Sequence, residues 1–496
     1  MADEIMFNEC MQSAIIRAQE EIDKKKDSVK TGEMRQNYHF MPQTGWLNDP
    51  NGLVYYKDKY HFFYQYNPYA GFWGSMHWGH AISDDMIHWD YLPLALAPSE
   101  EYDNHYQGGC FSGSAIEHDD KLFLMYTGTT NMGKGFEQSQ CIAYSEDGIN
   151  FTKYEGNPVI SAPKGIPHNF FRDPKVWKHE DMFYMVCGAN NSGMAQALIY
   201  KSKDMFDWQF LNVLAESRGE WGYMWECPDF FKIHNKYVLT FSPMGVKERT
   251  CVYLVGDFDY ETGKFFYSET GEIDWGFDFY APQSFLSPDG RRIMVGWSNE
   301  WDWMPFWKDW GPAYREGWCG FFNIPREVEI REDNTLQFKP MRELSSLRRR
   351  YKKDKSVVLE KDKKFSLRTG NALELLVNIN IEKTQATEAV FELRADDKNC
   401  TYVTFDFRNM EMRFDRNNSD GWSKGIAKGP LNLIKKTKLD IHIFIDQSSI
   451  EVFSNEYQSN ISCNVFAKRS QGINNLIPRE GFLAIESIES WALNAK

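Results

Sequence analysis

The sequence has no long hydrophobic run, few positive charges relative to negative ones, and no paired cysteines, and each absence excludes a class of protein. No stretch approaches the roughly 18 consecutive apolar residues of a membrane-spanning helix. The chain carries 70 acidic and 56 basic residues, a net charge of −14, which suits a phosphate backbone poorly. We therefore expect neither a membrane nor a nucleic acid as a partner.

The nine cysteines are isolated from one another, and their number is odd. Without any Cys-x-x-Cys pair, this pattern argues against a disulfide framework and against a thiolate zinc site. The N-terminal residues include Asp3 and Glu4, where a secretory signal would carry positive charge. We expect reduced thiols and a cytoplasmic location. No Gly-x-Ser-x-Gly elbow and no phosphate-binding glycine loop occurs, so serine-nucleophile and nucleotide chemistry have no support.

Aromatic residues, in contrast, make up 16 % of the 496 residues, which excludes a disordered chain and, at this length, indicates two or three domains. One hairpin-like phrase recurs five times: a polar turn followed by an alternating apolar and aromatic run. Its copies begin 62, 60, 55 and 56 residues apart, at Tyr60, Leu122, Met182, Tyr237 and Ile293. Repeats of this length hold about four strands each, which is typical of propeller blades. A β-sandwich with coincidental spacing is the alternative.

The repeats divide the chain into four parts. Residues 1–37 form an N-terminal extension, with an amphipathic helix expected over 5–27. Residues 38–345 are predicted to form a five-bladed β-propeller, and the polar, basic stretch 346–356 a linker. From 357 to 496 the pattern changes to short alternating strands without the repeated phrase, which predicts a second all-β unit, a sandwich.

Three acids occupy nearly the same position in their repeats. Asp49 and Glu226 each lie 11 residues before the first apolar residue of the hairpin, and Asp173 lies 9 before it. Because the first strand of each blade lines the central axis, these side chains should converge at one end of the channel. An isolated Asp-Pro would be an ordinary turn. Phe111, Ser112 and Tyr280 are predicted at the same position in the other two blades.

Converging carboxylates repel one another, which raises the pKa of at least one of them. Glycoside hydrolysis uses such a set, with one carboxyl protonated and another ionised. Tryptophans flank these motifs, and a sugar presents both hydroxyls and an apolar face. For each tryptophan separately, burial between blades is the simpler explanation.

At these residues the sequence resembles glycoside hydrolase family 32, the β-fructofuranosidases, which include invertases, sucrose-6-phosphate hydrolases and fructan exo-hydrolases. The motifs are WLNDPNG from Trp46, FYQYNP, WGSMHWGHAISDDMIHW, FSGS, FRDP and WECPDFF. The resemblance runs from about His39 to the C-terminus. It implies a propeller joined to a sandwich, and retaining hydrolysis of a terminal β-D-fructofuranoside with no cofactor.

The resemblance also implies roles for individual residues. Asp49 matches the nucleophile, Glu226 the general acid/base and Asp173 the transition-state stabiliser. Retention requires two such groups about 5–5.5 Å apart. The positions that match the family's fructose pocket are Asn48, Gln65, Trp73, Phe111, Ser112 and Arg172. Tyr280 is expected to lie near Glu226 and help set its pKa, and Trp301 is a weaker match to the pocket. Trp303 is an alternative to Trp301.

Several alternatives stay open at this stage. The substrate is sucrose, sucrose 6-phosphate or a short fructo-oligosaccharide, and an exo-acting fructan hydrolase or a catalytically silent fructan-binding protein would share the motifs. A propeller glycosidase acting on arabinan or xylan would also have three acids. A zinc site at His77 and His80 is disfavoured because residues three apart on a strand face opposite sides, so no metal is predicted. The sandwich stabilises the propeller, binds carbohydrate or forms a homodimer.

Overall fold

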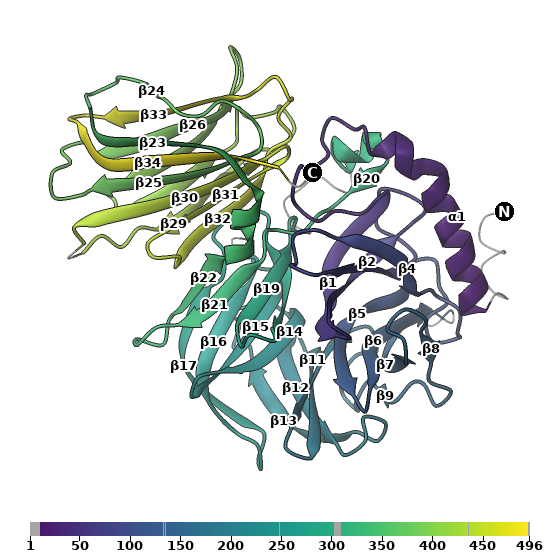
Figure 1. The fold of residues 1–496 in the computed structure, drawn as a ribbon. Coiled ribbons are helices and arrows are strands. Elements are labelled where there is room, and N and C mark those ends of the chain that lie inside the picture. Colours follow the sequence, from purple (N-terminus) through teal and green to yellow (C-terminus); the bar gives the residue numbers. More distant parts are fainter. Residues whose placement is uncertain are drawn as a thin grey trace.

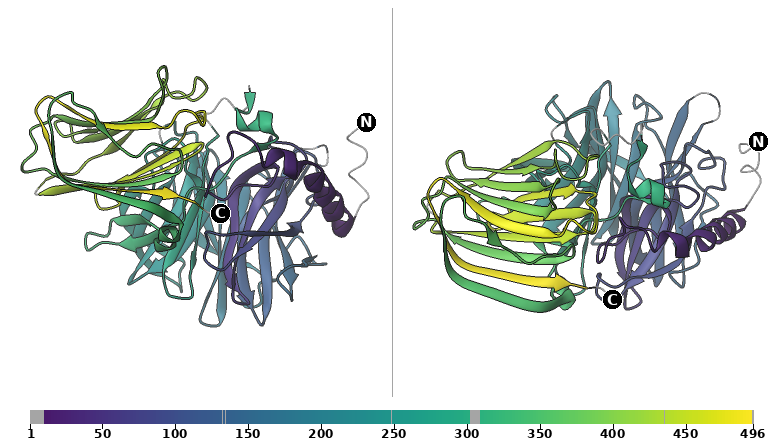
Figure 2. Two further views of the ribbon diagram at one scale, coloured as in Figure 1. Left: turned by 45° about the horizontal axis from the view of Figure 1, so that its top comes forward. Right: turned by 90° about the horizontal axis from the view of Figure 1, so that it is seen from above.

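The computed structural model describes residues 10–494 except 132, 134, 248, 302–308 and 435. These residues form a five-bladed β-propeller beside a two-sheet β-sandwich, with a helix against the propeller (Figure 1). Figure 2 shows the sandwich, green to yellow, next to the purple-to-teal propeller. The all-β fold predicted from the repeats is confirmed. Among the described residues, no helix has both the length and the hydrophobicity needed to cross a membrane.

Each blade is built mainly from four antiparallel strands in chain order. Blade one comprises β1 Gly45–Tyr56, β2 Lys59–Asn67, β3 His77–Ser83 and β4 Asp90–Leu96, with β20 Trp318–Cys319 parallel to β1. Blade two comprises β5 Gly109–His118, β6 Lys121–Asn131, β7 Phe136–Ser145 and β8 Thr152–Lys153, and β9 Ile160–Ser161 also pairs with β7. Blade three comprises β10 Phe171–His179, β11 Met182–Asn191, β12 Met194–Ser202 and β13 Gln209–Glu216. Blade four comprises β14 Met224–Ile233, β15 Lys236–Met244, β16 Val252–Asp259 and β17 Lys264–Glu272.

Blade five comprises β18 Tyr280–Leu286, β19 Arg292–Trp297, β21 Arg326–Ile330 and β22 Leu336–Pro340. The five copies of the hairpin phrase coincide with the second strand of each blade. The innermost strands β1, β5, β10, β14 and β18 contact one another in sequence, and β18 contacts β1. This last contact closes the ring.

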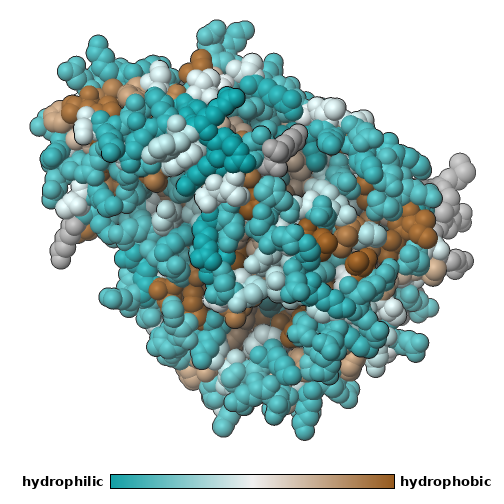
Figure 3. Space-filling view, in the orientation of Figure 1, coloured by the Kyte–Doolittle hydropathy of each residue, from teal (hydrophilic) through white to brown (hydrophobic). Residues whose placement is uncertain are grey.

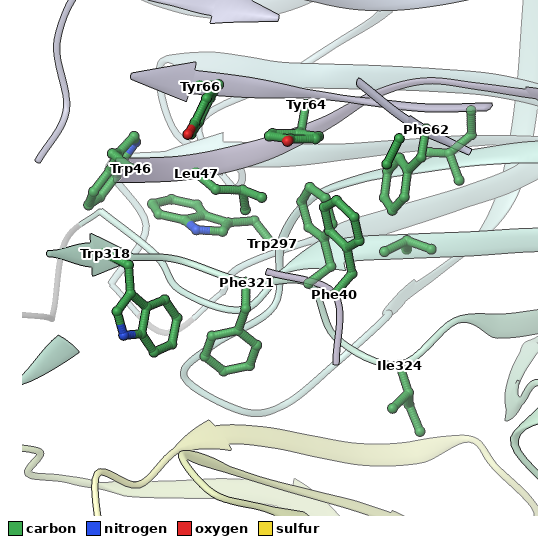
Figure 4. Close-up of a cluster of buried hydrophobic side chains, with 14 of the residues drawn as sticks. Phe40, Trp46, Leu47, Phe62, Tyr64, Tyr66, Trp297, Trp318, Phe321 and Ile324 are labelled. Carbon is green, nitrogen blue, oxygen red and sulfur yellow. The ribbon is translucent and has the colours of Figure 1, made fainter. Parts of the chain in front are cut away.

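Aromatic packing fills the join between the first and last blades (Figure 4). Trp46 on β1 packs edge-on against Trp297 on β19, with ring centroids 5.6 Å apart. Phe40, which precedes β1, stacks on Phe322 at 5.6 Å. Such pairs contribute about 0.5–1.5 kcal/mol each beyond the area that they bury. The segment before the propeller therefore helps to hold the ring closed.

A β-bulge interrupts every innermost strand at the same level. The register shifts between Leu47 and Pro50, Phe111 and Gly113, Arg172 and Lys175, Glu226 and Asp229, and Tyr280 and Gln283. Bulges bend a strand and re-aim its side chains. Asp173, Cys227 and Ala281 have positive φ values of 63°, 49° and 49°, a conformation that non-glycine residues rarely adopt. The same local distortion thus recurs around the axis, and the predicted catalytic acids lie in it or next to it.

The sandwich consists of two six-stranded sheets in the described residues. The first sheet has the order β23 Arg348–Leu359, β34 Leu483–Leu493, β25 Leu373–Asn380, β30 Lys438–Asp446, β31 Ser449–Ser454 and β32 Ser459–Asn464. The second has the order β24 Phe365–Ser366, β33 Ile473–Arg479, β26 Glu388–Ala395, β27 Thr401–Asp406, β28 Glu411–Asp415 and β29 Ile426–Pro430. A common core of aliphatic and phenyl side chains lies between them.

Two sequence-based boundaries differ from the structure. Residues 346–356 are not a linker: the short helix η2 (Arg342–Leu347) leads directly into β23, the edge strand of the first sandwich sheet. Most of the basic side chains of this strand face solvent, and that exposure gives the segment the composition of a linker. The helix predicted over 5–27 is α1 Met11–Val29, and residues 5–9 of that prediction lie outside the described residues. A second short helix, η1 Ala313–Glu316, precedes β20. The face seen in Figure 3 is predominantly hydrophilic.

A buried ionic network joins the two domains. Arg326 on β21 lies 2.8 Å from Asp274 of the propeller and 2.9 Å from Glu451 on β31, and all three side chains are at most 1 % exposed. His39 also bridges to Glu451 and to Asp446. Burial opposes the charge of His39, but its hydrogen bonds to both carboxylates outweigh burial and raise its pKa to about 9.

The network predicts a large stability cost for Arg326→Met. Removing one partner leaves two buried carboxylates without their shared cation, a change that costs about 3–5 kcal/mol. The control Arg342→Met removes an exposed arginine that pairs with Asp289 and should cost less than about 1 kcal/mol. Urea unfolding followed by fluorescence measures both. If both variants lost the same free energy of unfolding, the buried network would not be what stabilises the domain junction.

Candidate active site

A cavity of about 450 Å³ opens at the level of the bulges. The strands β1, β5, β10 and β14 each contribute residues to its wall, so it lies on the propeller axis. Its lining consists of Asn48, Asp49, Gln65, Trp73, Gln107, Phe111, Ser112, Thr129, Phe136, Gln138, Asn169, Phe170, Arg172, Asp173, Glu226, Met244 and Trp301.

The structure brings the sequence-predicted site residues together. Asp49, Asp173 and Glu226 all line the cavity, and so do seven of the other predicted residues: Asn48, Gln65, Trp73, Phe111, Ser112, Arg172 and Trp301. Tyr280 lies behind the wall and donates a hydrogen bond to Glu226. Trp303, the alternative to Trp301, lies outside the described residues.

Asp49 is held by two donors from other blades. The hydroxyl of Ser112 donates to its Oδ2 at 2.6 Å, and the thiol of Cys227 approaches the same atom at 3.5 Å. Burial and the nearby charge of Glu226 raise the pKa of Asp49 to about 6, although the hydrogen bond from Ser112 opposes this shift. Asp49 is therefore ionised at neutral pH and oriented by fixed contacts, as a nucleophile requires.

Arg172 is the positive centre of the cavity. Its Nη2 and Nε donate to Oε1 of Glu226 at 2.9 and 3.2 Å, and its Nε lies 3.8 Å from Oδ2 of Asp173. Gln138 and the carbonyl of Asn169 accept further hydrogen bonds from its Nη1. One guanidinium thus compensates two carboxylates and is fixed in place by its remaining contacts.

Asp173 lies deepest among the three acids, at 4 % exposure. Its backbone N–H donates to Thr127, and its Oδ2 accepts the backbone N–H of Cys227 at 2.9 Å. Burial raises the pKa of Asp173, Arg172 opposes that shift, and the charges of Glu226 and Asp49 add to it. This carboxyl therefore takes up a proton more readily than an exposed aspartate.

Glu226 is clamped between a cation and a phenol. Its Oε1 accepts from Arg172, and its Oε2 accepts the hydroxyl of Tyr280 at 2.6 Å. The side chain remains 16 % exposed, toward the cavity. It is thus positioned to exchange a proton with a bound molecule.

Seven lining residues were not predicted from the sequence: Gln107, Thr129, Phe136, Gln138, Asn169, Phe170 and Met244. The repeat register holds a signal for two of them, because Thr129 and Met244 each stand seven residues after the first apolar residue of a hairpin phrase. The other five lie in loops or at the start of β7, where the repeats diverge and no motif marks them.

The histidines considered for zinc have separate partners. His77 contacts the carbonyl of Ser75, whereas His80 contacts His61 at 3.0 Å. Burial lowers the pKa of both His77 and His80. Each ring thus has a hydrogen-bond partner within the first blade.

Comparisons with known proteins agree with this site. The model of the glycosyl hydrolases family 32 N-terminal domain matches residues 39–340, and that of the family's C-terminal domain matches residues 343–492. The chain is 36 % identical to a sucrose-6-phosphate hydrolase of Zymomonas mobilis, covering 97 % of this chain and 96 % of that protein. It is also 36 % identical to a raffinose invertase of Escherichia coli, with 92 % and 94 % covered.

A solved structure of a Bombyx mori β-fructofuranosidase variant in complex with sucrose is similar as well, at 33 % identity. Its TM-score is 0.81, and the match covers 97 % of this chain and 98 % of the other.

The burial of Asp49 predicts that Asp49→Asn makes the protein more stable. Its pKa is raised in the folded state, so the native carboxyl binds more protons than the unfolded one between about pH 4 and 6, and native stability declines as pH rises through that window. The amide has no charge to bury, and at pH 7 we expect a gain of about 1–3 kcal/mol.

Urea unfolding at pH 7 and pH 4 tests this expectation, because the gain should shrink at the lower pH. The exposed Asp181→Asn provides a matched control and should leave stability unchanged at both pH values. A destabilised Asp49→Asn protein at pH 7 would refute the electrostatic account of the cavity.

Proposed function

The chain belongs to glycosyl hydrolase family 32 and is a β-fructofuranosidase, and we propose that it releases the terminal fructose of sucrose-type substrates by a retaining double displacement through Asp49, Glu226 and Asp173. The observation that carries this proposal is the convergence of the three carboxylates in one cavity around Arg172. The similarity to a sucrose-6-phosphate hydrolase and to a raffinose invertase supports the class of substrate.

In the first step, a carboxylate oxygen of Asp49 attacks C2 of the fructosyl unit while Glu226 donates a proton to the departing glycosidic oxygen. The C2–O bond breaks, and its electron pair stays on the leaving sugar. A fructosyl ester forms on Asp49. The contacts from Ser112 and Cys227 hold the attacking carboxylate in place before the substrate arrives, so little reorganisation accompanies the attack.

In the second step, Glu226 takes a proton from water, which attacks C2 and releases Asp49 and fructose. Glu226 thus acts as the acid in the first step and as the base in the second. Two displacements at C2 retain its configuration.

Asp173 is proposed to accept hydrogen bonds from fructose hydroxyls as positive charge develops on the ring. Its Oδ2 is fixed by the N–H of Cys227, and Arg172 lies 3.8 Å away. A carboxylate oriented in this way before the substrate binds stabilises an oxocarbenium-like transition state electrostatically. The buried Asn48, Gln65 and Ser112 line the same floor and add polar groups for sugar hydroxyls.

Replacing Glu226 by Gln should lower kcat for fructose release by at least about 10²-fold, since the amide cannot transfer the proton. Sucrose binding should persist because the side chain keeps its volume. Calorimetric titration and a fructose assay separate the two effects. Glu220→Gln, which changes an exposed glutamate in the loop before β14, should retain full activity. Turnover by Glu226→Gln within tenfold of the parent enzyme would rule out the acid/base assignment.

The acidic limb of the pH profile of kcat/KM should have its midpoint near pH 6. Activity falls below that pH as Asp49 becomes protonated and loses its nucleophilic form. Ser112→Ala removes a hydrogen bond that lowers this pKa, so the limb should move to higher pH. Ser114→Ala serves as the control, because that hydroxyl lies on the same strand and donates to Pro174 instead. An identical limb in all three proteins would show that Asp49 does not control it.

A further inference from the structure

The cavity has a polar floor and an aromatic mouth. Asn48 and Gln65 on the floor are buried, whereas Gln107 and Asn169 are exposed. Because Glu226 protonates the departing oxygen, fructose occupies the floor under the proposed function and the leaving group extends toward the mouth. The residues at the mouth therefore face the part of the substrate that differs between sucrose, its phosphorylated form and longer saccharides.

Two phenyl rings, Phe136 and Phe170, are partly exposed at the mouth and fixed from behind. The ring of Phe136 packs edge-on against His105 at 5.5 Å, and that of Phe170 against Tyr223 at 6.1 Å. Trp73, which also lines the cavity, packs edge-on against Phe111 at 6.2 Å. Rings held in this way offer flat apolar faces that suit the C–H face of a sugar.

The loop that carries Phe170 is anchored by hydrogen bonds. Gln138 on β7 donates its N–H to the carbonyl of His168 at 2.8 Å and accepts the N–H of Phe171 at 3.1 Å. The carbonyl of Phe170 accepts the N–H of Asn190 at 3.2 Å. The fold therefore fixes the position of Phe170 at the mouth of the cavity.

The residues that line the cavity carry more negative than positive charge. Among the described residues that line it, Arg172 alone is positively charged, and it is already engaged by Glu226 and Asp173. Three carboxylates against one guanidinium leave a net negative charge, and this holds even when one carboxyl is protonated. The mouth contributes amides and rings, but no described cation, to meet an anionic leaving group.

We propose that the leaving-group site selects neutral saccharides and discriminates against a phosphorylated one, with Phe136, Phe170 and Gln107 as specificity-determining residues. This inference rests on the proposed function and specifies its substrate class. A phosphate on the leaving sugar carries up to two negative charges near pH 7, and it would approach a negatively charged cavity without a counter-ion. The Coulomb repulsion between the phosphate and the carboxylates weakens as the salt concentration rises.

The test compares kcat/KM for fructose release from sucrose, raffinose and sucrose 6-phosphate. We expect the phosphorylated sugar to be at least tenfold poorer than sucrose in low salt, and the gap to narrow as ionic strength rises. Raffinose, which is neutral, should stay within tenfold of sucrose. Equal or better turnover of sucrose 6-phosphate would overturn the inference and leave the proposed function intact.

A charge variant tests the location of the discrimination. Gln107→Arg introduces a cation at the mouth and should raise the kcat/KM ratio of phosphorylated to unphosphorylated sucrose several-fold, and Gln107→Leu, the uncharged control, should not. An unchanged ratio in Gln107→Arg would contradict this placement. Lys134 and Lys308 lie outside the described residues. The variants Lys134→Gln and Lys308→Gln therefore test whether either lysine binds the phosphate. A selective loss of activity on the phosphorylated sugar in either variant would also overturn the inference.

Binding to the Glu226→Gln protein measures the same preference without turnover. Calorimetry with sucrose and sucrose 6-phosphate should give a Kd at least tenfold lower for sucrose. Tighter binding of the phosphorylated sugar would contradict the inference. If no substrate released fructose from the parent enzyme, the proposed function would fail, and this binding ratio would still decide the specificity.

Discussion

The burial of three carboxylates around one guanidinium is the constraint on which the rest of the site depends. Arg172 bonds to Glu226 and lies close to Asp173, and without it the cavity would hold three mutually repelling acids. With it, the pKa of Asp49 still rises to about 6. The pKa of Asp173 is raised as well, so burying these charged carboxylates opposes folding. Activity and stability therefore oppose each other at these residues.

The propeller makes this arrangement possible by repeating one local distortion. Each innermost strand carries a bulge at the same level, and three of the bulges include a non-glycine residue with positive φ. Strain of this kind persists only where the surroundings over-determine it. The closed ring, the aromatic join at Trp46 and Trp297, and the buried junction with the sandwich at Arg326 supply that support.

Much of the fold and of the active site was predictable from the sequence, because propeller repeats are periodic and their register aligns equivalent residues. The spacing of five hairpin phrases predicts the fold, and the offsets of Asp49, Asp173 and Glu226 predict their convergence. The mouth was not predictable. Phe136 and Phe170 lie where the repeats diverge, and only tertiary contacts such as that of Phe170 with Tyr223 place them. Likewise, the composition of 346–356 reflects an exposed edge strand, which sequence alone does not distinguish from a linker.

The central claim is that Asp49 carries the fructosyl unit between the two displacements. Acid quenching of the enzyme during turnover of sucrose, followed by peptide mass spectrometry, tests it most directly. The account predicts a mass increase of one fructosyl residue on the peptide that contains Asp49, and none on the same peptide of Asp49→Asn. An adduct on the peptide containing Asp173 or Glu226 would contradict it.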